Sequence, residues 1–125
     1  MVGVIGIGID AVDVVRFRET LERTPSFRDR VFTTDELAPL SERVDPVPSL
    51  AARFAAREAV MKAMGVGLGA FDFHDVWVTS LDSGRPVLQV SGRAESLARE
   101  RGIASWHLSL THTDHLAIAY VVASA

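Results

Sequence analysis

The sequence predicts an α+β domain, and three observations lead to this class. An apolar, alternating segment opens the chain, one long helix-forming segment occupies its middle, and two pairs of short alternating segments follow. Strands and helices that come in separate runs are typical of α+β domains. The chain has 125 residues, about the size of one domain. We therefore expect a single domain over residues 1–125.

The first predicted strand covers residues 2–9 and is expected to be buried. Side-chain alternation divides it into two faces. They are Ile5, Ile7 and Ile9 on one side and Gly6, Gly8 and Asp10 on the other. Because glycine has no side chain, a ligand or a neighbouring backbone can approach the second face closely.

Two helices are predicted in the next segment. Apolar positions at helical spacing over residues 13–23 predict the first, which Pro25 ends. Thr33 and Glu36 have the spacing of a capping box, so a short helix is expected to begin there.

The strongest predicted helix covers residues 49–64. Residues 44–48 contain two prolines and are expected to form a loop before it. The helical segment is rich in alanine, lacks interior glycine and proline, and ends at Gly65.

The second half of the chain predicts strands joined by tight turns and one helix. These elements are a strand at 76–80, a turn at 82–86, a strand at 87–90, a helix at 93–101, and a hairpin of strands 106–111 and 116–122.

Composition excludes several classes of protein. Cysteine is absent, which excludes disulfides and cysteine-based zinc sites. A net charge of −3 argues against nucleic acid as the main partner. No apolar run approaches the roughly 18 residues of a membrane span, and the short apolar start lacks the features of a signal peptide. We expect a cytoplasmic protein with no membrane partner.

The mean hydropathy of +0.20 is high for so short a chain. A small domain cannot hide all its apolar surface internally, so some is expected to be buried between subunits. Residues 16–30 hold five arginines against three acidic residues. This segment is either a site for an acidic partner or a solvated helix face.

Asp10 ends the first predicted strand beside the two glycines. A carboxylate at this point could bind a metal ion. It could equally be the N-cap of the helix that follows.

Four side chains of the long helix fall at steps of four and form one line along its surface. They are Leu50, Phe54, Glu58 and Lys62. One interpretation is a core stripe that ends in an exposed Glu–Lys pair. The other adds the parallel line of Arg53 and Arg57. Three basic groups around an anion, with Glu58 holding a cation, would suit a pyrophosphate with Mg²⁺. Lys62 is the single lysine of the chain.

Gly65, Gly67 and Gly69 follow this helix. Glycines let backbone N–H groups reach a phosphate. No Lys-Ser/Thr pair follows, so this is not a Walker A loop, and a helix cap with a loop explains it equally well.

The strand at 106–111 alternates between apolar and polar residues. Trp106, Leu108 and Leu110 are expected to face inward, and His107, Ser109 and Thr111 outward. The polar face could bind phosphate or ribose, or simply be solvated. His74 and His115 have no partner pattern and are expected to be structural.

Together these segments resemble the holo-acyl-carrier-protein synthase family of 4′-phosphopantetheinyl transferases. The matching stretches are residues 6–10, 53–59, 62–65, 84–86 and 107–112, in the family's order and spacing. The block Phe-Ala-Ala-x-Glu-Ala-x-x-Lys-Ala is the specific part. The resemblance implies a small domain in which an antiparallel sheet packs against a long central helix.

The resemblance also implies an activity, namely transfer of 4′-phosphopantetheine from coenzyme A to a serine of apo-acyl carrier protein, with release of 3′,5′-ADP. It implies Mg²⁺ held by Asp10 and Glu58, and Lys62 as the group that neutralises developing phosphate charge. These three residues form the expected catalytic set. The expected coenzyme A contacts are Arg53, Lys62, Gly65, Gly67, His107 and Ser109.

Further implications concern assembly and partners. Family members are homotrimers with sites at subunit interfaces, and the basic first helix, around Arg16 and Arg23, would face the acidic carrier protein.

Glu58 acting through a metal-bound water is the expected base for the serine proton, with Asp10 as the alternative. The family often has lysine where this chain has Arg57, which keeps the charge and is expected to bind an anion.

Two other functions remain open from the sequence. One is a non-catalytic module that binds coenzyme A or a carrier protein. The other is a Mg²⁺-dependent nucleotide pyrophosphohydrolase, although such enzymes have denser carboxylate clusters, such as Glu-x-x-Glu, than this chain.

Overall fold

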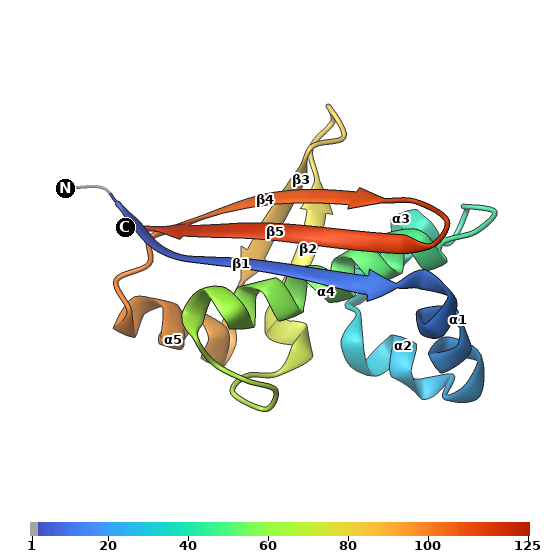
Figure 1. Cartoon of the computed structure of the whole chain (residues 1–125), viewed down its shortest axis with the longest axis horizontal. Coiled ribbons are helices and arrows are strands. Elements are labelled where there is room, and N and C mark those ends of the chain that lie inside the picture. Colours follow the sequence, from blue (N-terminus) through green and yellow to red (C-terminus); the bar gives the residue numbers. More distant parts are fainter. Residues whose placement is uncertain (1–2) are drawn as a thin grey trace.

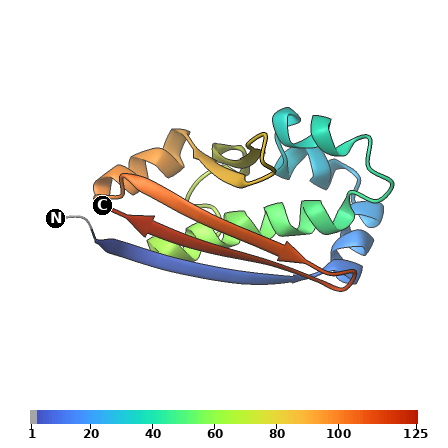
Figure 2. The same ribbon diagram turned by 90° about the horizontal axis from the view of Figure 1, so that it is seen from above.

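Helix α4 (Val47–Met64) is the centre of the fold. The computed structural model describes residues 3–125. A three-stranded antiparallel sheet lies along one side of α4, in the order β1 (Val4–Asp13), β5 (Leu116–Ser124), β4 (Ser105–His112). Smaller elements cover the other side (Figures 1 and 2). The predicted α+β class, with an antiparallel sheet packed against a long central helix, is confirmed.

The sheet and α4 pack almost backbone to backbone. A Cβ atom added at Gly8 would lie 1.9 Å from the carbonyl oxygen of Ala59, and one added at Gly6 would lie 1.9 Å from that of Ala63. The facing side of β5 is made of small residues, including the buried Ala119. The glycine face of β1 therefore receives a neighbouring backbone, one of the two alternatives that the sequence left open.

The prediction that the first strand is buried is wrong for this chain. Strand β1 is at the edge of the sheet, and Ile5, Ile7 and Ile9 are 43%, 57% and 56% exposed. The strand has the two predicted faces, one with the isoleucines and one with the glycines, but the glycine face is the one that packs against the core. Val2, the second residue of the predicted strand, lies outside the described residues.

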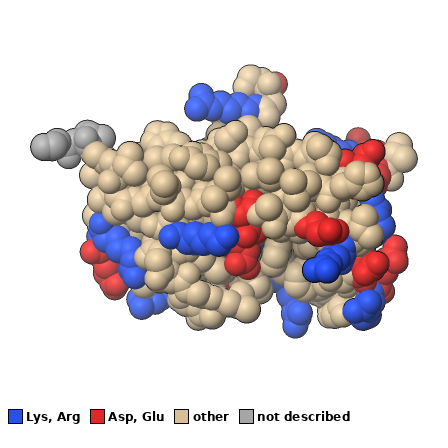
Figure 3. Space-filling view, in the orientation of Figure 1, with Lys and Arg blue, Asp and Glu red and all other residues tan. Residues whose placement is uncertain are grey.

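The exposed isoleucines continue into an apolar sheet face. Ile7 is paired with Val122 and Ile9 with Tyr120 in the β1–β5 register. In the space-filling view, the band over the three-stranded sheet carries few charged side chains, which gather below it (Figure 3). We call this surface the outer sheet face.

Three helices lie at one end of α4: α1 (Val14–Arg23), α2 (Ser26–Val31) and α3 (Thr34–Leu40). The predicted capping box of Thr33 and Glu36 is confirmed at the start of α3. Helix α4 begins two residues before the predicted start because Pro48 is in its first turn, where proline is tolerated. Helix α2 was not predicted.

The remaining elements follow α4 in the chain. They are the 3₁₀ helix η1 (Phe73–Asp75), the hairpin of β2 (Val76–Ser80) and β3 (Pro86–Val90), and α5 (Gly92–Glu100). The hairpin projects beyond the three-stranded sheet (Figure 1). Over residues 3–125, no helix has the length and apolar character needed to cross a membrane.

Candidate active site

Asp10 and Lys62 meet where β1 crosses the C-terminal half of α4. The Lys62 Nζ atom donates to Asp10 Oδ1 at 3.1 Å and to the carbonyl oxygen of Ile9 at 2.9 Å. The Asp10 side chain is 17% exposed and that of Lys62 is 56% exposed. This contact depends on Gly8, which lets the strand lie directly on the helix.

Asp10 is not a helix cap. The N-cap of α1 is Asp13, whose Oδ1 accepts a hydrogen bond from the backbone N–H of Arg16 at 3.0 Å. Asp10 therefore has no part in starting the helix, and its carboxylate faces α4.

Glu58 is half-buried beside this pair. Burial raises its pKa above the usual 4.5, the negative charge of Asp10 raises it further, and the positive charge of Lys62 lowers it. No ion pair joins Glu58 to Lys62 within residues 3–125; Lys62 contacts Asp10 instead. The exposed Glu–Lys pair considered from the sequence is therefore not formed.

The two carboxylates fit a divalent cation. They are close enough for the charge on Asp10 to raise the pKa of Glu58, and a cation between them would relieve this repulsion. Carboxylate oxygens are hard ligands of the kind that Mg²⁺ prefers, and Mg²⁺ usually keeps several waters and substrate phosphates in its coordination sphere. Two protein ligands suit this pattern, and no cluster of three or more potential ligands occurs among residues 3–125.

The line of four residues along α4 is present and runs from core to solvent. Leu50 is fully buried, Phe54 and Glu58 are half-buried, and Lys62 is exposed. The helix thus enters the core at one end and presents charged groups at the other.

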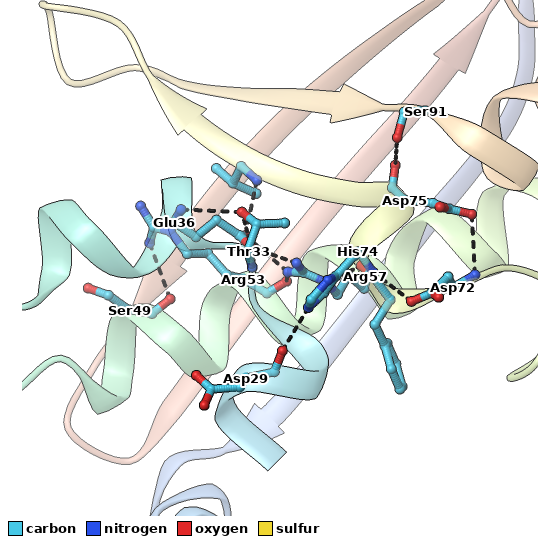
Figure 4. Close-up of polar contacts among 12 residues, drawn as sticks. Asp29, Thr33, Glu36, Ser49, Arg53, Arg57, Asp72, His74, Asp75 and Ser91 are labelled. Atoms are coloured by element: carbon cyan, nitrogen blue, oxygen red, sulfur yellow. Dashed lines mark hydrogen bonds and ion pairs between the residues drawn. The ribbon is translucent and has the colours of Figure 1, made fainter. Parts of the chain in front are cut away.

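The expectation that Arg57 binds an anion is wrong. Its side chain is fully buried and forms a two-pronged ion pair with Glu36, at 2.6 Å and 3.0 Å. Its Nε donates to the carbonyl oxygen of Phe73 at 2.9 Å, and Glu36 also accepts from the backbone N–H of Val78 at 3.1 Å. Figure 4 shows this network between α3, α4 and the segment after α4. Arg57 joins these elements inside the core, where its fully buried side chain is out of reach of a ligand.

Arg53 has a different environment. It lines a cavity of about 200 Å³ together with Arg43 and His112, and no acidic side chain within residues 3–125 is part of that lining. Its Nη1 donates to the carbonyl oxygen of Ser49 at 3.2 Å, whereas its buried Nε has no partner among the described residues. We call this the arginine pocket.

Burial lowers the pKa of Arg53; the nearby Glu36 carboxylate opposes this, and the positive charges of Arg43 and Arg57 add to it. A guanidinium stays charged at neutral pH, so the arginine pocket is a positively charged recess suited to an anion. Sequence reasoning missed Arg43 and His112, because only the fold brings them next to Arg53.

The two predicted glycines lie just beyond Lys62. Gly65 ends α4 in the left-handed conformation, with φ of 70°, and its N–H donates to the carbonyl oxygen of Lys62 at 3.1 Å. The helix-cap interpretation therefore accounts for Gly65. Gly67 is exposed, and a Cβ at that position would meet no atom within 4 Å.

His107 and Ser109 lie on the outer sheet face, as predicted. Trp106, Leu108 and Leu110 pack inward against the core. Because the sheet separates His107 from α4, one chain does not bring it together with Asp10, Glu58 and Lys62. The predicted residues thus form three groups: the Asp10–Glu58–Lys62 cluster with the adjoining glycines, the arginine pocket, and the polar residues of β4.

Comparisons with known proteins agree on one family. The family model of the 4′-phosphopantetheinyl transferase superfamily matches residues 6–121. The chain is 48% identical to the holo-[acyl-carrier-protein] synthase of Micrococcus luteus, over 96% of this chain and 91% of that protein. It is 50% identical to the one of Streptomyces avermitilis, over 96% and 97%.

Solved structures of the same kind match the fold. The acyl carrier protein synthase of Plasmodium yoelii with ADP bound has a TM-score of 0.90 at 28% identity, covering 100% of this chain and 98% of that one. The holo-(acyl-carrier-protein) synthase of Bacillus anthracis, in complex with coenzyme A (3′,5′-ADP), has a TM-score of 0.81 at 31% identity, covering 98% and 97%. The chain therefore belongs to the 4′-phosphopantetheinyl transferase superfamily, within the family of holo-[acyl-carrier-protein] synthases.

Proposed function

We infer that this chain transfers the 4′-phosphopantetheine group from coenzyme A to a serine hydroxyl of apo-acyl carrier protein and releases 3′,5′-ADP. The observation that carries the inference is the cluster of Asp10, Glu58 and Lys62 at the crossing of β1 and α4, in a chain whose relatives are holo-[acyl-carrier-protein] synthases. Two carboxylates beside one ammonium group match a reaction that brings a hydroxyl to a pyrophosphate.

Asp10 and Glu58 are the residues that would hold Mg²⁺. When bound, Mg²⁺ would neutralise charge on the pyrophosphate of coenzyme A. Burial raises the pKa of Glu58 and the charge of Asp10 raises it further; this second effect supports the assignment, because it marks two carboxylates that lie in one small region.

Glu58 is the group that takes the proton from the serine. Its half-buried carboxylate lies beside the Asp10–Lys62 pair, where a serine hydroxyl would approach the pyrophosphate. The serine oxygen forms a bond to the β-phosphorus, and the bond from that phosphorus to the bridging oxygen breaks. The electron pair leaves with 3′,5′-ADP. Asp10 accepts a hydrogen bond from the Lys62 ammonium group and so positions it beside the reacting groups.

Lys62 balances the negative charge that develops on the leaving phosphate. Its ammonium group is a compact point charge on a flexible stem, and more than half of its side chain is exposed. Its charge is therefore accessible to the phosphate of a bound ligand.

The remaining coenzyme A contacts are assigned to Arg53, Gly65, Gly67, His107 and Ser109. The arginine pocket is suited to a phosphate, and lies about 14 Å along the axis of α4 from Lys62. A dinucleotide-sized ligand can span such a distance. His107 and Ser109 would join a site only across a subunit boundary, because the sheet separates them from α4.

A homotrimer that uses the outer sheet face satisfies this requirement. The exposed isoleucines of β1 and the apolar side chains of β5 form a surface that a lone chain leaves in water. Exposed Arg16 and Arg23 on α1 would meet the acidic carrier protein, and the enzyme would act in the cytoplasm.

The test is intact-protein mass spectrometry of an apo-acyl carrier protein incubated with this chain, coenzyme A and Mg²⁺. We expect a mass gain of one phosphopantetheine that EDTA abolishes. Coenzyme A binding without any mass gain would favour a non-catalytic binding module. Hydrolysis of coenzyme A without carrier modification would favour a pyrophosphohydrolase.

A further inference from the structure

Three polar side chains form a hydrogen-bonded chain at one end of the outer sheet face. Ser105 of β4 is directly opposite Ser124 of β5, and His107 follows two residues later on the same side of β4. The Ser105 and Ser124 Oγ atoms are 2.6 Å apart, and His107 Nε2 is 3.1 Å from Ser124 Oγ. The mechanism above uses His107 but gives neither serine a role.

The three groups differ in exposure. Ser124 is 8% exposed, whereas Ser105 and His107 are exposed. The middle hydroxyl is therefore shielded and fixed by its two partners. Within residues 3–125, His107 Nδ1 has no hydrogen-bond partner, so the imidazole is anchored through one nitrogen and presents the other.

The number of protons limits how this chain can be arranged. A serine hydroxyl has one proton to donate, and neutral imidazole carries its proton on only one nitrogen. When Ser105 donates to Ser124 and Ser124 donates to Nε2, the imidazole proton is on Nδ1. When the direction is reversed, Nδ1 has a lone pair instead.

The ligand decides between these two directions. A fully ionised phosphate oxygen only accepts hydrogen bonds, so it requires a proton on Nδ1. A bare Nδ1 would repel it. Two hydroxyls can rotate to supply this arrangement. A carboxylate in the place of Ser124 would instead fix the proton on Nε2.

We propose that Ser124 and Ser105 are positioning residues for His107, which hold its ring in the Nδ1–H form so that it donates to a phosphate oxygen of coenzyme A. This proposal rests on the proposed function, since it takes coenzyme A as the ligand. Ser124 orients the ring directly through its hydrogen bond to Nε2. Ser105 donates a hydrogen bond to Ser124 and so orients the Ser124 hydroxyl toward the ring.

The test uses full-length Ser124→Ala, Ser124→Thr and Ser105→Ala chains. In Ser124→Ala we expect the Kd for coenzyme A, from calorimetry, and the KM to rise about five- to tenfold, the effect of one lost hydrogen bond to an anion-binding group. The kcat is expected to change less than about twofold. Threonine, which keeps the hydroxyl, is expected to restore both constants. Ser105→Ala is expected to act in the same direction with a smaller effect.

Nitrogen-15 NMR of His107 gives a readout that general destabilisation would not change. With coenzyme A bound, the unmodified chain is expected to show an Nδ1–H signature with Nε2 accepting a hydrogen bond, whereas in Ser124→Ala the Nε2 signal is expected to move to that of a nitrogen without this bond. Ser96→Ala serves as a matched control, because that exposed hydroxyl of α5 donates only to the backbone carbonyl of Gly92.

Unchanged coenzyme A affinity together with an unchanged His107 spectrum in Ser124→Ala would overturn the proposal. An Nε2–H signature in the coenzyme A complex would do the same. A chain that binds coenzyme A but modifies no carrier would contradict the proposed function alone, since the affinity and the NMR signature would still decide the role of Ser124.

Discussion

Arg57 and Lys62 both project from α4 and both meet a carboxylate, a little more than one helical turn apart. The Arg57–Glu36 pair is fully buried and makes further hydrogen bonds to the backbone of Phe73 and Val78. The Lys62–Asp10 pair has one contact of 3.1 Å, and Lys62 is largely in solvent. The first pair therefore fixes the helix within the fold, whereas the second keeps two charged groups available to a ligand.

The largest expected effect comes from breaking the buried pair. Arg57→Met leaves the Glu36 carboxylate buried without its partner, so we expect a loss of about 3–5 kcal/mol in the free energy of unfolding. Urea denaturation measures it. The exposed pair of Arg18 and Asp45 is a matched control, and Arg18→Met is expected to lower the urea midpoint much less than Arg57→Met does. Equal losses in the two variants would contradict the contrast between buried and exposed pairs.

The second pair can be disturbed without changing any charge. A methyl group at Gly8 would lie 1.9 Å from the Ala59 carbonyl oxygen, so Gly8→Ala must move β1 away from α4. We expect a loss of about 1–3 kcal/mol in the free energy of unfolding and a fall in transfer rate, because Asp10 moves with the strand. Gly3→Ala is the control, since its Cβ would enter open space. Full activity in Gly8→Ala would show that the position of β1 is not critical.

Lys62 is expected to matter for turnover more than for folding. Lys62→Ala removes an exposed charge, so the free energy of unfolding should change by less than about 1 kcal/mol. We expect kcat for carrier modification to fall about 10- to 100-fold, with a smaller change in coenzyme A affinity. Steady-state kinetics separates the two. An unchanged rate at saturating coenzyme A would show that Lys62 does not stabilise the transition state.

The smallest expected effect is a gain in stability. The pKa of Glu58 is raised in the folded chain, so its ionised form opposes folding once the pH exceeds the ordinary value of 4.5. In metal-free buffer, Glu58→Gln should therefore raise the Tm by about 1–3 °C at pH 7. The difference should vanish near pH 3.5, where glutamate is protonated in both states. A lower Tm for the glutamine variant at pH 7 would contradict the direction of this pKa shift.

The contrast between the two pairs also marks what the sequence could predict. The periodicity of α4 placed Glu58 and Lys62 on one line, and the family motif assigned them to the site. Arg53 and Arg57 looked equivalent because both are basic and one turn apart. Only the fold reveals that Arg57 is buried and forms an ion pair with Glu36, which is distant in the sequence.

A similar limit explains the error on β1. Alternation identified its two faces correctly but could not tell which one the core would take. Large apolar residues normally face inward, yet here the glycines do, because α4 lies too close for any side chain. The high mean hydropathy predicted apolar surface outside the core, but it did not indicate which residues form it.

The pairing of β1 with β5 has a consequence for the order of folding. Asp10 is paired with Ala119, near the other end of the chain. During synthesis, β1 emerges first but has no strand to pair with until β5 has emerged. Asp10 is therefore synthesised early but reaches its position in the sheet only after β5 has been synthesised. Contacts of such long sequence separation slow the folding of a domain. A nascent chain that lacks β5 would have α4 and its Lys62 but no sheet to hold Asp10 against them.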